Sequence, residues 1–536
     1  MTKHQRTVLV ACILATAVVL VDSTVVNVAL PAIERDLGGG LAGQQWTSNA
    51  YLLTLGSLLL IGGSLGDVFG ERRVFGAGVV GFGVTSVLCA VAPTIELLVA
   101  ARALQGVAGA LLTPAALAVI VNTFPPDQRG RAIGAWTAWA GIGAVLGPLV
   151  GGQIVDNASW RWIFAINVPL LVFTLVLITR TMSGPERTER GKVDLIGAGL
   201  CAAGLAGMTY GLIEQPLKGF GDPVVFIPLV AGVLLFAGFL AYERRTPAPM
   251  LPLDLFKRRN FAIGNVQTLT MYGGLGLLFF FLILFLQQVA GYSALEAGTA
   301  TLPVSVVMFF LSARFGALAD RFGPRWLMGA GPLVAAVGLA LFTRLDEDVS
   351  YLTDLLPAMA LFALGLSMTV APLTATVLAD ADERNAGVAS GVNNAIARVA
   401  GLVAVAGVGV LVAAQYGSVL DEQLGRLADR PALAAPLEAA RRQPLAEVRA
   451  QGLPPAVRRR LAEATDSASV SAFRFGMGIA AALVAGGGLL GLIGLRNPRR
   501  EVKCADCPGG ALAGAPLDAV PADDLPRVRL PREAPA

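Results

Sequence analysis

Charged residues are scarce in this sequence: only 15% of its 536 residues are Asp, Glu, Lys or Arg. A soluble domain has roughly a quarter. Together with a mean hydropathy of +0.67, this scarcity excludes an ordinary soluble fold. The net charge of +4 gives no reason to expect a nucleic-acid partner. Apolar residues (55%) and 63 glycines are abundant instead. A membrane-spanning helix needs about 20 apolar residues, and small residues let such helices pack closely in lipid.

Histidine and cysteine are also rare, with one and five copies. Three cysteines fall inside apolar stretches, where cysteine is usually a small core residue. Cys504 and Cys507 form a lone C-x-x-C far from His4, and a zinc site would need a second pair of ligands. We therefore expect no metal and no cofactor. The sequence has no Walker loop, no nucleotide-binding domain and no catalytic-triad spacing. It is predicted not to be an enzyme, and its energy source is predicted to be a gradient instead of ATP.

Apolar segments predict an all-α integral membrane protein with fourteen spanning helices. The first segment is too long for the apolar region of a signal peptide and lacks a small-residue cleavage site, so we expect it to be retained. The predicted spans are residues 7–32, 46–66, 74–92, 95–121, 131–155, 162–181, 193–213, 224–242, 261–286, 296–318, 326–344, 353–375, 385–413 and 471–495.

The spans divide into two sets of six with two helices inserted between them. Residues 1–190 are predicted to form an N-terminal six-helix bundle, and residues 191–245 the two inserted helices. Residues 246–500 are predicted to form a C-terminal six-helix bundle with a hydrophilic outer loop at 415–470. Residues 501–536 are rich in Pro, Ala and Asp and are predicted to be a disordered cytoplasmic tail.

The basic residues of the short loops predict the topology. Most of them fall on the side of the two termini, whereas the other side holds only Arg35, Arg161, Lys218 and Arg344. Because short cytoplasmic loops carry the excess of Lys and Arg, both termini are predicted to be cytoplasmic. The arginines of the long outer loop do not contradict this, since long loops cross regardless of charge.

An eleven-residue stretch between two spans, residues 63–73, recurs at an offset of 253 as residues 316–326. Polar, glycine-rich hairpins at matching places in two halves of a membrane protein are typical of a secondary transporter. The aspartates suit a helix N-terminus, and the arginines suit the cytoplasmic headgroups. Such a contact can latch one conformation; a static topology anchor is the alternative. The predicted latch residues are Gly63, Asp67, Gly70, Arg72, Arg73, Asp320 and Arg325.

Asp22 lies midway along the first span, where an ionised carboxylate costs roughly 2.5–3.5 kcal/mol. Because burial disfavours the charged form, Asp22 is expected to carry a proton or to bind a cation; a structurally held carboxylate is the alternative. Arg102 in the fourth span keeps its charge when buried and is expected to tune proton release, or to form a structural ion pair. Glu214, at the outer end of an inserted helix, is a possible second proton site.

Gly143, Gly147 and Gly151 in the fifth span lie four residues apart and predict a smooth face that another helix can approach closely. Pro148 bends this helix and frees a backbone carbonyl.

Other polar or aromatic residues of the spans are candidates for lining a substrate cavity. Aromatic residues near span ends more often form interface belts. The candidates are Asn27, Tyr51, Trp139, Asn167, Gln267, Tyr272, Asn393, Asn394 and Arg398.

Jointly these motifs resemble the major facilitator superfamily, and within it the fourteen-helix branch of drug:proton antiporters of the multidrug efflux type. Residues 63–73 and 316–325 resemble the family's signature loop and its partner, and residues 22–31 resemble the branch's first-helix motif. Residues 102–106 are similar to the family's fourth-helix motif, whose arginine is linked to proton transfer. Residues 143–152 are similar to the helix motif associated with antiporters.

The resemblance implies alternating access and proton-coupled export of small amphiphilic drugs or toxic compounds across a bacterial cell membrane. The expected partners are that substrate, protons and membrane lipids, with a monomer as the functional unit. Alternatives are a dedicated exporter of a metabolite or antibiotic made by the host, as in self-resistance, and an exporter of a lipid-like substrate. A membrane sensor reusing the fold is a further alternative, but a sensor has no need of a proton couple.

Overall fold

The structure, a computed structural model, describes residues 1–181, 194–247, 249–379, 386–425, 437, 440–441, 444–445 and 454–497. Some side chains within these helices, including those of Asp67 and Asp320, are outside the description. The regular secondary structure of the described residues is helical. Met1–Leu495 form one compact unit, and the predicted tail at 501–536 lies outside the described residues.

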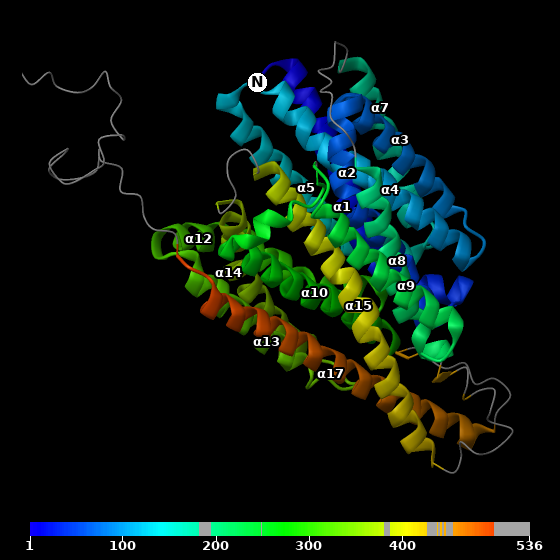
Figure 1. The fold of residues 1–536 in the computed structure, drawn as a ribbon. Helices are drawn as coiled ribbons and strands as arrows, with labels where there is room; N and C mark the ends of the chain where they lie inside the picture. Colours follow the sequence, from blue (N-terminus) through cyan, green and yellow to red (C-terminus); the bar gives the residue numbers. More distant parts are fainter. Residues whose placement is uncertain are drawn as a thin grey trace, which may run out of the picture. The chain divides into compact units, whose positions relative to one another are not determined.

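The first part of the chain forms seven helices followed by an inserted pair (Figure 1). Thr2 begins α1 with a capping box, in which its hydroxyl accepts from the Gln5 N–H at 3.2 Å. The helices are α1 (Lys3–Leu37), α2 (Gly40–Phe69), α3 (Glu71–Ala90), α4 (Ile95–Thr123), α5 (Pro126–Asn157), α6 (Trp162–Ala165), α7 (Asn167–Thr181), α8 (Leu195–Lys218) and α9 (Pro223–Glu243).

The second part of the chain begins after α9 and repeats the pattern of long helices joined by short turns. Its elements are η1 (Leu253–Lys257), α10 (Arg259–Gln288), α11 (Ala294–Ala300), α12 (Leu302–Phe322), α13 (Pro324–Phe342), η2 (Tyr351–Leu355), α14 (Leu356–Ala379), α15 (Ala386–Leu424) and α17 (Pro455–Gly494).

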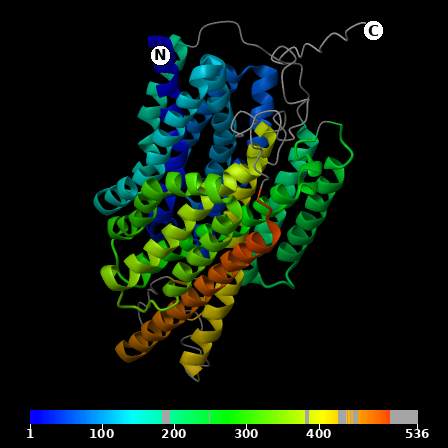
Figure 2. The same ribbon diagram turned by 90° about the vertical axis from the view of Figure 1, so that its left-hand side faces the viewer.

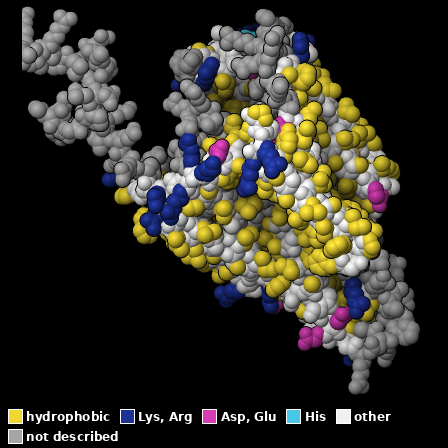
Figure 3. All heavy atoms as spheres, viewed as in Figure 1, with side chains coloured by type: hydrophobic (Ala, Val, Ile, Leu, Met, Phe, Trp, Pro, Cys, Tyr) yellow, Lys and Arg dark blue, Asp and Glu magenta, His cyan; other side chains and the backbone are white. Residues whose placement is uncertain are grey.

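Each predicted span falls on a long helix or on two short consecutive ones, and α15 and α17 extend well beyond the last two predicted spans. Within the described residues, twelve helical segments are long and apolar enough to cross a membrane. The remaining two predicted spans fall on α2 and α5, helices of 30 and 32 residues. Apolar side chains dominate the face seen in Figure 3, and charged ones are few there. The protein is therefore a multi-pass membrane protein.

The repeated stretch forms the same backbone turn in both halves. Gly70 (φ +95°) separates α2 from α3, and Gly323 (φ +86°) separates α12 from α13. L-residues with a side chain rarely adopt this φ, so glycine allows one residue to join two antiparallel helices.

The two ends of the interval 415–470 are helical in the described residues. α15 continues to Leu424 and α17 begins at Pro455 (yellow, and orange to red, in Figure 1). Tyr416 and Leu420 on α15, and Leu461 and Ala464 on α17, are buried in one apolar cluster. The described polar residues at the two ends of this interval therefore lie on the outer faces of two amphipathic helices.

The inserted helices α8 and α9 lie side by side in both ribbon views (Figure 2). Glycines bring them close: a Cβ at Gly207 would lie 2.5 Å from the Pro228 carbonyl oxygen. α8 also packs against α2 and α15, so the pair covers a seam between the first and second parts of the chain.

Several contacts join the two parts at the end of the bundle opposite the N-terminus. Asp156, at the end of α5, accepts hydrogen bonds from the N–H groups of Ala294 and Leu295 at 2.9 and 2.8 Å, which caps α11. Gln287 Nε2 donates to the Val28 carbonyl at 2.9 Å, and Gln45 Nε2 to that of Val405 at 3.2 Å. This end, called the far end below, is closed by these contacts.

Candidate functional site: a buried ion pair beside a central cavity

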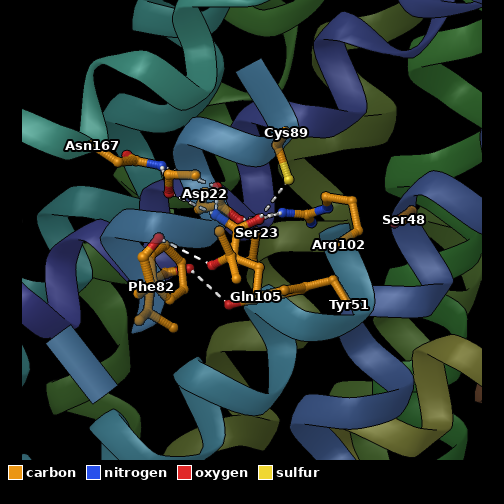
Figure 4. A network of polar contacts seen from close by, with 12 residues as sticks. Asp22, Ser23, Ser48, Tyr51, Phe82, Cys89, Arg102, Gln105 and Asn167 are labelled. Atoms are coloured by element: carbon orange, nitrogen blue, oxygen red, sulfur yellow. Dashed lines mark hydrogen bonds and ion pairs between the residues drawn. The ribbon is translucent and has the colours of Figure 1, made fainter. Parts of the chain in front are cut away.

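The carboxylate of Asp22 is buried at the centre of the first helical group (Figure 4). Its Oδ2 lies 2.5 Å from Arg102 Nη1 on α4. Its Oδ1 accepts from Gln105 Nε2 at 3.0 Å and from Asn167 Nδ2 at 3.1 Å. Three donors from α4 and α7 therefore satisfy the charge that the sequence places in the membrane.

Arg102 is 1% exposed and is held on several sides. Its Nη1 also donates to Gln105 Oε1 at 2.7 Å, and its Nε donates to the Thr47 carbonyl on α2 at 3.1 Å. The guanidinium carbon lies 4.3 Å from the centre of the Tyr51 ring, within the range of a cation–π interaction. Hydrogen bonds of this kind fix the orientation as well as the charge of the guanidinium.

Ser86 of α3 completes the group, which we call the Asp22 network: Asp22, Arg102, Gln105, Asn167, Thr47 and Ser86. Gln105 Nε2 donates to Ser86 Oγ at 2.9 Å, and the Cys89 thiol lies 3.6 Å from Gln105 Oε1. These contacts set which end of the Gln105 amide faces Asp22. Five helices, α1, α2, α3, α4 and α7, thus contribute to the network around this carboxylate.

Local sequence explains how α4 reaches this position. Arg102 and Gln105 are three residues apart and share one helix face. Gly106 follows them, and a Cβ there would lie 2.3 Å from the Tyr51 carbonyl oxygen. Only glycine lets α2 come this close, which brings Thr47 and Tyr51 up to Arg102.

A central cavity of about 460 Å³ lies next to the network. Ser23, Thr24 and Asn27 present one face of α1 to it, while Asp22 is not among its lining residues. The other walls come from α2, α10, α14 and α15. The lining on α14 and α15 reaches Val377 and Ser390, near the helix ends on the N-terminal side. The cavity thus extends from the centre toward the N-terminal end, away from the closed far end.

Five of the predicted cavity residues line this cavity: Asn27, Tyr272, Asn393, Asn394 and Arg398. The other four lie elsewhere.

Tyr51 and Asn167 are buried against Arg102 and Asp22 and belong with the network. Gln267 is buried on α10, and its Nε2 donates to the Met328 carbonyl, so it joins α10 to α13. Trp139 is 61% exposed on α5 and is absent from the lining of this cavity. An aromatic side chain suits a lipid-facing position as well as a cavity wall.

The glycine face of α5 packs on α1 directly beside Asp22. A Cβ at Gly147 would lie 2.0 Å from Thr24 Oγ1, and one at Gly151 would lie 2.3 Å from Val25 Cγ2. Gly143 faces Ala17 in the same way. The Pro148 carbonyl faces Gly298 of α11, where a Cβ would lie 2.5 Å away. This face therefore joins α1 to the far-end closure.

Glu214 lies apart from the Asp22 network. It forms an ion pair with Lys218 at 3.1 Å and accepts from Trp46 Nε1 at 3.4 Å. The predicted second proton site is thus a local pair on α8, without contact to Asp22.

The predicted latch residues lie at the N-terminal end of the bundle. Gly63 faces Pro114, and Arg325 Nε donates to the Leu492 carbonyl at 2.6 Å. Arg72 is partly buried and Arg73 is exposed. Since the side chains of Asp67 and Asp320 are outside the described residues, a latch contact through them stays a prediction.

Residues 12–405 match the family model of the Major Facilitator Superfamily. Relatives include a puromycin resistance protein (pur8) of Streptomyces alboniger, 40% identical over 74% of this chain and 80% of the relative. Another is a tetracenomycin C resistance and export protein of Streptomyces glaucescens, 36% identical over 88% and 87%.

Among solved structures, the fold is similar to that of a bacterial homologue of the human lysosomal transporter Spinster in an inward-facing, unoccupied conformation. The TM-score is 0.61 with 19% identity, covering 93% of this chain and 100% of that one. This likeness concerns the fold alone. Taken with the family match, the relatives and the central cavity, it leads to one conclusion: the chain belongs to the major facilitator superfamily and is a membrane transporter, not an enzyme.

Proposed function

We propose that this protein exports small amphiphilic, antibiotic-like compounds across the bacterial cytoplasmic membrane in exchange for protons. The supporting observation is the position of α1 between a buried carboxylate and the cavity. Asp22 faces Arg102, whereas the next residue, Ser23, lines the cavity. Helix α1 therefore contributes residues to both the proposed proton site and the proposed substrate cavity.

Protonation of Asp22 is the step that couples the two sites. It removes the negative charge that compensates Arg102 and leaves a buried guanidinium without its ionic partner. Breaking a buried pair in this way costs about 3–5 kcal/mol, so the protonated network favours a different arrangement. Proton and substrate can drive the cycle because each binds the two arrangements with different affinity.

A movement of α1 is transmitted to the far end through its glycine contact with α5. Gly147 and Gly151 hold α5 against α1, and Asp156 at the end of α5 caps α11. A shift of α1 then changes the contact that closes the far end. This is the observation that links the network to alternating access.

We place both termini in the cytoplasm, from the distribution of basic residues in the short loops. With this topology the cavity opens inward and the far end is the outer closure. We also propose bundles at residues 1–190 and 246–500, since the cavity lies between α1–α2 and α10–α15. Because one chain supplies the walls of the cavity, a monomer suffices for transport in this proposal. Lipids cover the apolar outer surface.

A dedicated exporter of one metabolite is the second candidate. It is supported by the names of the two relatives given above, each of which contains a single antibiotic. Such a protein would transport one compound class and reject unrelated amphiphiles.

The test uses the full chain in liposomes with an acidic lumen and a neutral exterior. Exchange for outgoing protons should drive uptake of a panel of fluorescent amphiphiles that are cationic, neutral and anionic, and a protonophore should abolish it. Uptake of several classes supports broad export, and uptake of one class supports the dedicated exporter. Uptake that survives the protonophore in all cases would contradict proton coupling.

A further inference from the structure

The side chains that line the central cavity carry positive charge and no negative charge. Among its lining residues Arg398 of α15 is the only charged side chain, and none is Asp or Glu. Arg398 has no hydrogen-bond or ion-pair partner among the described residues, in contrast to Arg102. A guanidinium keeps its charge in such a place and is costly there unless something compensates it.

A second donor in the same cavity is also unpartnered. Asn49 on α2 lines the cavity, is 1% exposed, and its buried Nδ2 has no hydrogen-bond partner in the described structure. A buried amide left without a partner costs about 1–3 kcal/mol. An acceptor from a bound molecule would satisfy it.

Both donors belong to neighbouring walls. Asn49 and Gly56 are seven residues apart and share a face of α2. A Cβ at Gly56 would lie 3.2 Å from the Cβ of Arg398. The base of the Arg398 side chain on α15 therefore packs directly against that face of α2. The remaining lining includes Tyr272, Phe279 and Phe280, which form an aromatic, apolar surface.

A cationic substrate has no carboxylate partner in this arrangement. The cavity lining offers no carboxylate, and Asp22 is buried behind Ser23 with its oxygens occupied by Arg102, Gln105 and Asn167. A second positive charge beside Arg398 would be repelled.

We propose that the cavity selects compounds that join an acidic or anionic oxygen group to an aromatic, apolar body, with Arg398 as the charge partner and Asn49 as a second hydrogen-bond donor. This inference rests on the proposed transport function and narrows its substrate class. In place of a cation site at Asp22, it puts an anion site at the cavity walls formed by α2 and α15.

The test compares two probes with the same ring system, 8-anilinonaphthalene-1-sulfonate and the neutral N-phenyl-1-naphthylamine. Each is titrated against the full chain in nanodiscs, and the signal of empty nanodiscs is subtracted. Wild type is expected to bind the sulfonate about 10-fold or more tightly than the neutral probe. Charge-assisted hydrogen bonds of this kind are worth about 10- to 100-fold in affinity.

Arg398→Gln is expected to remove that preference while changing affinity for the neutral probe less than about 2-fold. Asn49→Leu should weaken sulfonate binding by a smaller factor. Arg398→Lys keeps the charge and should retain most of the preference, which keeps the test valid if the glutamine variant does not fold. Arg314→Gln is the matched control, since Arg314 is an exposed arginine on α12 outside the cavity lining; it should behave as wild type.

Equal weakening of both probes in Arg398→Gln, or no preference for the sulfonate in wild type, would overturn the inference. Gradient-driven transport is measured with the same variants reconstituted in liposomes with an acidic lumen. An Arg398-dependent preference without transport refutes the proposed function but supports the anion site. Transport without an Arg398-dependent preference supports the proposed function but refutes the anion site.

Discussion

Asp22 and Ser23 are consecutive residues of α1, yet Asp22 is sealed against Arg102 of α4 while Ser23 lines the central cavity. Successive residues of a helix point about 100° apart, so these two neighbouring side chains face the proposed proton site and the proposed substrate cavity. In the proposed mechanism, a change in the charge of Asp22 alters the cavity by moving α1, without direct contact between proton and substrate.

The buried pair of Asp22 and Arg102 predicts an asymmetric response to mutation. Arg102→Met leaves a buried carboxylate without its ionic partner and should destabilise the protein by about 3–5 kcal/mol. The double variant Asp22→Asn, Arg102→Met removes both charges and should recover a large part of that loss. Apparent Tm in detergent is the measurement, with Arg314→Met as the exposed control. Equal Tm values for the single and double variants would contradict the pairing.

The close contact between α5 and α1 predicts that a single methyl group at Gly147 is harmful. In Gly147→Ala the new Cβ meets Thr24 Oγ1 at 2.0 Å, so the helices must separate, and overpacking of this kind typically costs about 1–3 kcal/mol. Gly134 is on the same helix with nothing within 4 Å of its Cβ position, and Gly134→Ala should be tolerated. Transport and Tm of the two variants check this; equal loss in both would show that the effect is not steric.

The cap that Asp156 gives to α11 predicts a shift in the conformational equilibrium. Asp156→Ala removes two hydrogen bonds at a helix N-terminus, and loss of such a cap costs about 1 kcal/mol. The closed far end should become less populated by roughly 5-fold relative to the open one. Spin labels on the far ends of α5 and α11, read by pulsed electron resonance, would report this as a growing long-distance population. An unchanged distance distribution would exclude Asp156 from the closure.

The turns at Gly70 and Gly323 predict a backbone effect that is independent of side-chain contacts. Both residues have positive φ with an extended ψ of 128° and 149°, a backbone region in which a residue with a Cβ costs about 1–3 kcal/mol. Gly70→Ala and Gly323→Ala should therefore lower the apparent Tm. Gly76→Ala, at a helical position with nothing within 4 Å of the new Cβ, should leave it unchanged or raise it slightly. If all three variants behave alike, the turn conformation is not the reason for these glycines.

The sequence predicts the elements of this fold well, because lipid demands long apolar helices whose length and spacing are visible in the chain. It also singles out Asp22 and Arg102, since charges in apolar spans are costly. Their pairing is beyond such reasoning: helix periodicity gives the face of each residue, and the neighbouring helix depends on three-dimensional packing.

Ser86 and Thr47 show a second limit. Small polar residues are common in membrane helices, where they satisfy their own backbone, so nothing in the sequence marks these two as members of the network. Trp139 shows the converse, because its aromatic character fits lipid as well as a cavity. The charge of the cavity emerges only once Arg398 and Asn49 are seen to line one space.

The proposed coupling of the proton to transport through Asp22 is tested by measuring exchange and active transport separately. Liposomes holding wild type or Asp22→Asn are loaded with a transported fluorescent substrate, and exchange with external substrate is measured without a pH gradient. Accumulation is then measured with an acidic lumen. Asp22→Asn should retain exchange within a few-fold of wild type and lose gradient-driven accumulation. Accumulation at the wild-type level in Asp22→Asn would contradict the account.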